Sequence, residues 1–480
     1  MSHRLYDPTL AKHVAQDCRQ RWQLDDALMA YDDLAFRGAE DDRPVLHLED
    51  VTGIPFVDGV PGVEEYQHRA RVRATDGDLF AAGTRPAEGY EDYNQQHLQL
   101  GDTRFIYASH PDDPRAVARA CAQTDAFSTL CDVATDRGGL LIHPYMAIDT
   151  VWQLARKLHR HTDQPISVLG PPTPALWVAN DKSHLSHVVS EALSPDWLVQ
   201  TKRSSDPDTL TDELASMARR CDHVGLKRTR CASAMGNAVF DASEIRQQSR
   251  DQLRHQVDHF LERTRWTPDE DVLVVEWRPT DISPSTQLWI PPIDQGEPRL
   301  EGVYEQLLEG PEKVFLGSQP STLPDAVNHA IAQASLQVSA VFQALGYVGR
   351  CSFDFIITGD LHGDFQAAFT ECNGRWGGTS TPMHLVDRLL DFPESRPDYI
   401  ATDYYLPDSH AAMTFGDLRQ ALDEHLFDPL TGDGRFVLYN VGPLSECAKF
   451  DIISFGDDPE DARHGLQHIL PSTLGFDPPA

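Results

Sequence analysis

The chain has 480 residues, of which 74 are acidic and 41 are basic, so its formal net charge is −33. A surface this negative repels phosphate backbones and anionic lipids, so we expect neither a nucleic-acid nor a membrane partner. Apolar residues make up 40% of the chain, which is enough for packed cores and argues against disorder of the whole chain.

Cysteine usage and hydropathy indicate a cytoplasmic protein. None of the eight cysteines forms a Cys-x-x-Cys pair or has zinc-type Cys/His spacing, so no structural zinc is predicted. The polar N-terminal stretch and the lack of an apolar run of about 18 residues predict no signal peptide and no membrane span. We therefore expect reduced thiols in a cytosolic setting.

Alternating strands and helices in the N-terminal third predict a parallel α/β domain. Within residues 1–30 a short helix is predicted, because Leu10, Val14 and Cys18 recur at helical spacing. The strands predicted after it begin near 45 and lie at 104–109, 138–145 and 165–171, and the helices lie at 114–122 and 151–162. This alternation is typical of a parallel sheet. No Gly-x-Gly-x-x-Gly motif occurs there, so a dinucleotide site is not predicted.

A proline-rich stretch at 171–180 predicts a hinge, after which a longer mixed segment begins. Its predicted helices cover 181–192, 207–220, 242–264 and 324–345, and its predicted strands cover 223–227, 271–277, 350–358 and 364–373. Helix 324–345 has the clearest pattern, because its apolar residues share one side and Gly346 ends it. The last two strands enclose a short turn and form a hairpin. The tail after residue 400 is predicted to be α+β.

The hairpin carries the residues that most favour metal chemistry. Asp354 interrupts an apolar strand, and Glu371 and Asn373 lie two residues apart at the end of the next strand. Residues two apart in a strand share a face, and hairpin pairing can bring Asp354 to the same patch. Two carboxylates and an amide oxygen are hard ligands suited to Mg²⁺ that is held partly by phosphate. The alternative is an exposed polar hairpin, which the apolar neighbours of Asp354 disfavour.

A glycine-rich loop follows the hairpin directly. Arg375 is close enough in sequence to reach the metal ligands. Gly377 and Gly378 permit close backbone approach to a ligand, and Thr379 offers a hydroxyl and an N–H group. These groups suit a developing anion or a phosphoryl group. The alternative interpretation is a plain glycine-rich turn.

The order of these residues, an aspartate followed by Glu-x-Asn-x-Arg-x-Gly-Gly-Thr, resembles the ATP-grasp ligases over residues from about 100 to 390. It is most similar to the branch typified by the pheganomycin-type peptide ligases. The resemblance implies an ATP-grasp fold preceded by a Rossmann-like pre-ATP-grasp domain, a fold of α/β and α+β class. It implies that Asp354, Glu371 and Asn373 bind two Mg²⁺ ions, with Mn²⁺ as a substitute. It also implies that Arg375 stabilises an acyl phosphate or a tetrahedral intermediate.

Two of the seven lysines fall where the resemblance implies contacts with ATP phosphates. Lys182 lies at the predicted entry to the grasp fold, and Lys227 ends a strand before a loop that resembles a flexible lid. In that loop, Ser233 and Gly236 are the implied nucleotide contacts. Two localised cations can bind a polyanion inside a negative shell, because attraction at contact distance exceeds diffuse repulsion. The alternative is that each lysine is simply exposed.

Further contacts follow from the same resemblance. Glu276, near the end of strand 271–277, is the implied ribose contact. The residues implied to face the substrate are Arg278, Glu305, Gln306, Gly377, Gly378 and Thr379. Arg350 is a second candidate for stabilising the intermediate, since Ser352 stands where some ATP-grasp ligases have an arginine. Surface salt bridges are the alternative for Arg278 and Arg350.

The expected domains are an N-terminal α/β pre-ATP-grasp domain at 1–175, an ATP-grasp domain at 176–400 and a C-terminal α+β segment at 401–480. The grasp domain is divided into a lid subdomain at about 181–270 and a metal-site subdomain at about 271–400.

The predicted activity is ATP-dependent carboxylate–amine ligation through an acyl phosphate, which forms an amide or peptide bond and releases ADP and phosphate. The predicted partners are small-molecule carboxylates and amines, such as amino acids or peptides, and a homodimer is common among such ligases. One alternative is a non-catalytic ATP-binding or regulatory protein on the same scaffold. Another is a grasp-type enzyme with a different acceptor. The complete set of metal ligands with Arg375 disfavours the non-catalytic alternative.

Overall fold

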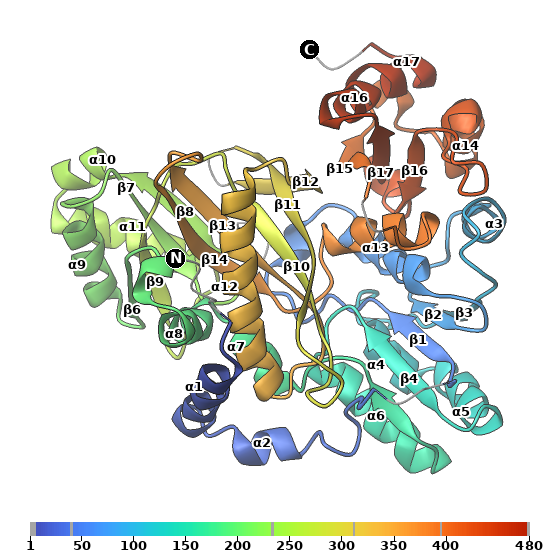
Figure 1. Cartoon of the computed structure of the whole chain (residues 1–480), viewed down its shortest axis with the longest axis horizontal. Helices are drawn as coiled ribbons and strands as arrows, with labels where there is room; N and C mark the ends of the chain where they lie inside the picture. The colour runs from blue at the N-terminus through green and yellow to red at the C-terminus, as the bar shows by residue number, and fades with distance from the viewer. Residues whose placement is uncertain (1–5, 39–41, 232–234, 311–312, 394–395, 478–480) are drawn as a thin grey trace.

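Three β-sheets organise the described part of the chain (Figure 1). The computed structural model describes residues 6–38, 42–231, 235–310, 313–393 and 396–477. One sheet has five strands, one has four and one has eight. The combination of a parallel sheet with antiparallel sheets confirms the predicted α/β and α+β class.

The N-terminal sheet is parallel throughout, as the alternation of strands and helices predicts. In spatial order its strands are β3 (Arg104–Tyr107), β2 (Leu79–Ala82), β1 (Val45–Leu48), β4 (Leu140–Pro144) and β5 (Ile166–Val168). Helices α4 (Val117–Gln123), α5 (Ala126–Asp136) and α6 (Asp149–Thr162) share its hydrophobic core. Apolar strands covered by helices are typical of parallel sheets, which are buried on both faces.

The four-stranded sheet is antiparallel. Its strands, in spatial order, are β6 (Thr201–Ser204), β9 (Val272–Glu276), β7 (His223–Arg228) and β8 (Asn237–Asp241). Helices α9 (Pro207–Ala218), α10 (Ala242–Gln247) and α11 (Arg250–Arg263) pack against it. The single helix predicted over 242–264 is wrong, because the chain is extended at Gln248 and Ser249. Ser249 then starts α11 through a capping box with Gln252, which satisfies the free N–H groups of a new helix.

The eight-stranded sheet links the predicted metal hairpin to the C-terminal segment. In spatial order its strands are β14 (Phe365–Asn373), β13 (Gly349–Gly359), β10 (Pro284–Ile290), β11 (Arg299–Glu309), β12 (Val314–Pro320), β15 (Asp398–Tyr405), β17 (Lys449–Gly456) and β16 (Phe436–Tyr439). Helix α12 (Asp325–Ala344) buries its predicted apolar side, including Ile331, Val338 and Phe342, in one core with β10 and β13. The sheet therefore continues without a break into the tail.

The remaining helices connect or cover these sheets. They are α1 (Pro8–Arg21), α2 (Asp25–Met29), η1 (Val57–Gly59), η2 (Val63–Arg73), α3 (Tyr90–Asp92), η3 (Tyr93–His97), α7 (Thr173–Asn180), α8 (Lys182–Ala192), η4 (Pro195–Trp197), α13 (Ser380–Leu389), η5 (Asp408–His410), α14 (Phe415–Leu422), η6 (Asp423–His425), α15 (Leu444–Cys447), α16 (Pro459–His464), η7 (Gly465–Ile469) and α17 (Leu470–Leu474). The hinge predicted at 171–180 is mostly α7, because Pro174 lies in the first turn, where a missing N–H costs nothing. No helix in the described residues is long and apolar enough to cross a membrane.

Arg388, on α13, ties this helix to the N-terminal region through three backbone carbonyls. Its Nη1 donates to the carbonyls of Val72 and Ala74, at 2.5 and 3.0 Å, and its Nη2 donates to that of Leu100, at 3.0 Å. Arg388→Ala should lower the free energy of unfolding by about 2–4 kcal/mol, because partly buried carbonyls lose their donors. Urea denaturation measures this effect. Arg299→Ala, at an exposed position on β11, is the control, and an equal loss in both variants would contradict the prediction.

Candidate active site

Asp354 and Glu371 face each other across the hairpin of β13 and β14. The pairing register places them directly opposite each other and shifts immediately after Asp354. Phe353 and Phe355 point into the core, so the alternation of the strand turns Asp354 to the other face. Asn373 donates its Nδ2 to Asp354 Oδ2 at 3.0 Å. The hairpin thus brings the three predicted metal ligands together.

The surroundings of Asp354 and Glu371 shift the pKa values of the two carboxyl groups in opposite directions. Burial, and then the neighbouring charge of Glu371, raises the pKa of Asp354 to about 7. Burial acts in the same direction on Glu371, but the ammonium of Lys182, 2.9 Å away, outweighs it and lowers the pKa of that carboxyl. A bound cation would offset the repulsion between the two carboxylates.

These residues fit Mg²⁺ by their chemistry. In the described residues, no group of three or more His, Cys, Asp and Glu side chains is placed to hold a metal ion. Asp354, Glu371 and Asn373 include only two such side chains, so they would supply only part of the coordination shell of a metal ion. Mg²⁺ is commonly bound through one or two carboxylates, with phosphate and water completing its shell.

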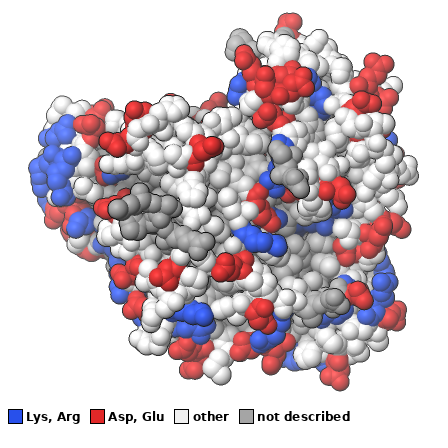
Figure 2. Space-filling view, viewed as in Figure 1, with Lys and Arg blue, Asp and Glu red and all other residues white. Residues whose placement is uncertain are grey.

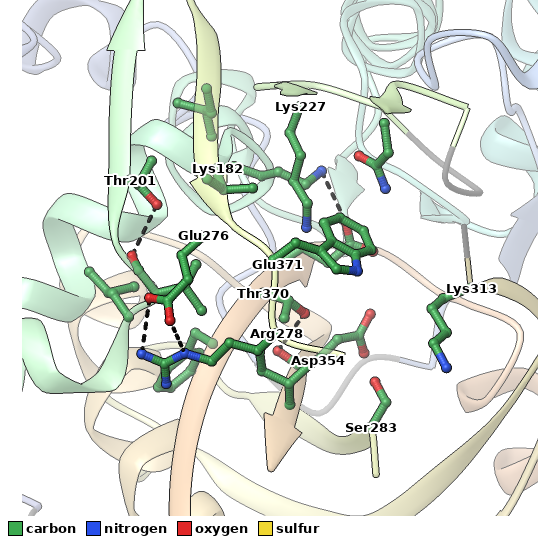
Figure 3. A pocket seen from close by; sticks show the side chains of 18 of the residues that line it. Lys182, Thr201, Lys227, Glu276, Arg278, Ser283, Lys313, Asp354, Thr370 and Glu371 are labelled. Atoms are coloured by element: carbon green, nitrogen blue, oxygen red, sulfur yellow. Dashed lines mark hydrogen bonds and ion pairs between the residues drawn. The ribbon is translucent and has the colours of Figure 1, made fainter. Parts of the chain in front are cut away.

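Lys182 and Lys227 lie in one cleft with the carboxylate pair (Figure 3). Lys182 begins α8, directly after the capping residue Asp181. Lys227 comes from β7 and places its Nζ 4.8 Å from the centroid of the Trp277 ring. Burial, and then the charge of Lys182, lowers the pKa of Lys227. Both ammonium groups lie near the carboxylate of Glu371, and such a corner suits a phosphate group.

The location of these lysines explains how a protein with a strongly negative net charge can bind an anion. Acidic and basic side chains are interspersed over the face of the molecule in Figure 2 rather than gathered in one field. Lys182 is 5% exposed and therefore lies beneath this surface. Its charge acts inside the cleft, where solvent screening is weak. A negative exterior and an anion-binding interior are compatible in this arrangement.

Apolar side chains line much of the same cleft. They include Leu198, Leu273, Val275, Ile356 and Phe369, from the two antiparallel sheets and the segment that joins α8 to β6. A slot of this kind suits a flat aromatic base. Glu276 and Arg278 also line the cleft and pair with each other at 3.0 Å. The predicted ribose contact and a predicted substrate contact therefore lie side by side.

A second cavity, of about 460 Å³, adjoins the first, because Asp354 and Glu371 line both. Arg375 lies in this second cavity, where its Nη2 donates to Asn373 Oδ1 and its Nη1 to the hydroxyl of Tyr145, both at 2.8 Å. The loop residues Gly377, Gly378 and Thr379 line the cavity as well. A Cβ at Gly378 would lie 2.4 Å from the ring of Phe315, so a larger residue would not fit without rearrangement.

Arg350 and Glu305 line neither cavity. Arg350 forms an ion pair with Glu301, and its guanidinium lies 4.4 Å from the centroid of the Trp376 ring. Glu305 accepts hydrogen bonds from the N–H and the hydroxyl of Thr322. For both residues, the predicted role in binding or catalysis stays a prediction.

The other predicted contacts are placed as follows. Gln306 lines both cavities. Gly236 packs against Cys231, and a Cβ there would lie 2.6 Å from the Cβ of that cysteine. Ser233 lies outside the described residues. Sequence reasoning missed Lys313, which lines both cavities, because nothing in its local pattern distinguishes it from an exposed lysine.

Comparison with known proteins identifies the fold but no close relative. No protein-family profile and no curated protein matches the sequence. N5-carboxyaminoimidazole ribonucleotide synthetase from Thermus thermophilus is similar in structure, with 14% identity, a TM-score of 0.51, and coverage of 91% of this chain and 99% of that one. The Staphylococcus aureus N5-carboxyaminoimidazole synthetase complexed with ADP has 10% identity, a TM-score of 0.52, and coverage of 92% and 99%.

Biotin carboxylase from Campylobacter jejuni, solved as a β-γ-ATP complex, is similar to the same degree. It has 12% identity, a TM-score of 0.52, and coverage of 88% of this chain and 90% of that one. These neighbours are ATP-grasp ligases, and the chain has the ATP-grasp fold that its hairpin motif predicts. The closer resemblance to the pheganomycin-type branch stays a prediction.

Proposed function

We propose that this protein is an ATP-dependent carboxylate–amine ligase that acts through an acyl phosphate. The observation that carries the proposal is the sharing of Asp354 and Glu371 by two adjoining cavities. One cavity has the two lysines and an apolar slot, which suits ATP. The other has Arg375 and the glycine-rich loop, which suits a carboxylate. The transferred phosphoryl group would then lie at the carboxylate pair, where both ligands meet.

Each side chain has a role in this proposal. Lys182 and Lys227 hold the phosphates of ATP, and the apolar slot holds its base. Arg375 orients the carboxylate of the substrate for attack on the terminal phosphate, and it stabilises the charge that develops on the acyl group. Phosphorylation replaces a poor leaving group with phosphate, so that an amine can attack the acyl carbon and release phosphate. Mg²⁺, when bound, neutralises charge on the phosphate oxygens.

The finer proposal is that the substrates are amino acids or peptides. The volume of the second cavity lies in the range of small-molecule sites. Tyr66, Tyr145 and Tyr439 line it, which gives it apolar walls with polar tips. We further infer a requirement for two Mg²⁺ ions with Mn²⁺ as a substitute, a cytoplasmic location, and a homodimer that size-exclusion chromatography would detect.

The proposed function is tested with hydroxylamine as a general acceptor amine. The purified protein is incubated with Mg·ATP, hydroxylamine and a panel of carboxylates that includes bicarbonate, amino acids and dipeptides. We expect release of ADP and phosphate, and a hydroxamate that mass spectrometry detects, with at least one carboxylate. Chelation of Mg²⁺ should abolish both products. Nucleotide binding in calorimetry without product from any carboxylate would contradict ligase activity and favour a non-catalytic ATP-binding protein.

Lys227→Ala should weaken ATP binding about 10- to 100-fold, because a charge-assisted contact is worth about 1.5–3 kcal/mol. Calorimetric titration with a non-hydrolysable ATP analogue measures this change. Lys202→Ala, at an exposed position on strand β6 of the same sheet, is the matched control. Unchanged affinity in the Lys227 variant would remove this lysine from the phosphate site.

A further inference from the structure

The second cavity extends from Arg375 to a group of charged residues on the C-terminal strands. Asp403 on β15 lies directly opposite Asp451 on β17, and both line the cavity. Lys449 lies two residues before Asp451 on the same strand and therefore on the same face. Residues of η2 cover this end of the cavity, since Tyr66 and Arg69 also line it.

Side-chain contacts connect this end to the proposed reaction centre. Arg375 donates to the hydroxyl of Tyr145 at 2.8 Å, and the guanidinium of Arg69 lies 5.5 Å from the centroid of the Tyr145 ring. The same guanidinium lies 4.5 Å from the Tyr66 ring, and Lys449 donates to the Tyr66 hydroxyl. This chain of contacts leads from Arg375 through Tyr145, Arg69 and Tyr66 to Lys449, beside the aspartates. A ligand that reaches both ends must carry two separate polar groups.

Asp451 has an acceptor oxygen without a partner. The residue is 4% exposed, and its Oδ2 accepts from Asn440 Nδ2 at 2.8 Å. Its Oδ1 is buried and has no hydrogen-bond partner among the described residues. Burial, and then the charge of Asp403, raises the pKa of Asp451 well above its ordinary value. A buried carboxylate oxygen without a donor is costly, so this position favours a ligand that donates a hydrogen bond.

The nearby cations already have partners. Lys449 lies 2.5 Å from Asp403, and Arg69 forms an ion pair with Glu49, whose side chain is fully buried. Because Arg69 is already paired with Glu49, Lys449 faces both Asp403 and Asp451 at this end of the cavity. A metal ion does not suit this position, because Lys449 already forms an ion pair with Asp403. In addition, no group of three His, Cys, Asp or Glu side chains placed to bind a metal occurs in the described part of the chain.

We propose that Asp451, supported by Asp403, binds a protonated amino group of the substrate that is phosphorylated, which makes the acyl donor an amino acid or a peptide with a free amino group. This inference rests on the proposed function, because it places the carboxyl group of that substrate at Arg375. An amine held on a carboxylate stays protonated and cannot act as the nucleophile. The site therefore protects the amino group of the donor from self-ligation, and the attacking amine belongs to the second substrate.

Matched pairs of carboxylates test the inference by binding. The pairs are L-alanine with propionate, 6-aminohexanoate with hexanoate, and glycylglycine with its N-acetyl derivative, each titrated calorimetrically in the presence of a non-hydrolysable ATP analogue and Mg²⁺. We expect the amino member of at least one pair to bind about tenfold or more tightly, since a site built for a charged donor rejects the analogue that lacks it. Equal binding within every pair would overturn the inference.

Substitutions test whether the preference for the amino member of a pair depends on Asp451. Asp451→Asn keeps the shape but loses the charge, so it should abolish the preference for the amino member while nucleotide affinity is unchanged. Asp403→Asn should weaken the preference, and it serves as a second test if the first variant is unstable by thermal melting. Asp433→Asn, at an exposed position of the same C-terminal segment, is the control. A preference that persists in both aspartate variants would overturn the assignment.

Turnover separates this inference from the proposed function. In the hydroxylamine assay, an amino member that binds preferentially but yields no hydroxamate would contradict ligase activity and leave the amine site standing. Hydroxamate formed equally from both members of each pair would support ligase activity and contradict the amine site. A raised KM for the amino substrate with nearly unchanged kcat in Asp451→Asn is the result expected of a binding residue.

Discussion

Asp354→Asn and Glu371→Gln should each reduce hydroxamate formation about a thousandfold or more, because each removes an oxygen anion from the proposed metal site at the point where phosphoryl transfer needs charge neutralisation. Steady-state kinetics at saturating Mg·ATP measure the loss. Asp364→Asn is the control, since this exposed residue lies beside the turn of the same hairpin. Turnover within about tenfold of the unmodified protein would contradict the metal assignment.

The two variants should differ in stability, and this difference separates function from folding. Asp354 is buried against Glu371, so its replacement by a neutral side chain removes repulsion, and the metal-free protein should melt at a higher temperature. Glu371 is the ion-pair partner of Lys182 at 2.9 Å, so its replacement leaves a buried ammonium without a counter-charge and should lower the melting temperature. A stabilised but inactive Asp354 variant cannot be explained by unfolding.

The hairpin could be predicted from sequence because its determinants are local. Asp354, Glu371 and Asn373 are separated by one turn, and the two-residue periodicity of strands decides which side chains share a face. The apolar side of α12 follows from helical periodicity in the same way. The recognisable motif lies in this region, and the ATP-grasp fold follows from it.

The far end of the second cavity could not be predicted, because its residues are distant in the chain. Lys449 meets Tyr66 across 383 positions of sequence, and no local pattern relates them. The strands β10, β11 and β12 were also missed, since β11 is of intermediate burial along most of its length and shows no clean alternation. The break between α10 and α11 was missed because Ser249 is a capping residue within an otherwise helical pattern.

The structure distinguishes the two arginines that the sequence offers for stabilising the acyl group. Arg375 lines the second cavity and contacts the proposed metal ligand Asn373, whereas Arg350 is buried in an ion pair with Glu301 and lines neither cavity. We therefore expect Arg375→Ala to lower kcat about 10²- to 10³-fold. Nucleotide affinity should hardly change, because Arg375 is absent from the lining of the lysine cleft.

Arg350→Met should have a different effect. Loss of this guanidinium leaves Glu301 without its partner and removes contact with Trp376, so the free energy of unfolding should fall while kcat of the folded fraction is kept. Urea denaturation and kinetics on the same preparations give both quantities, with Arg299→Ala as the exposed control. Arg375→Lys should recover little activity, because an ammonium cannot reproduce the two parallel N–H groups of the guanidinium. If kcat falls in the Arg350 variant and not in the Arg375 variant, the roles of the two arginines are reversed, and the carboxylate of the substrate must approach from the side of Trp376.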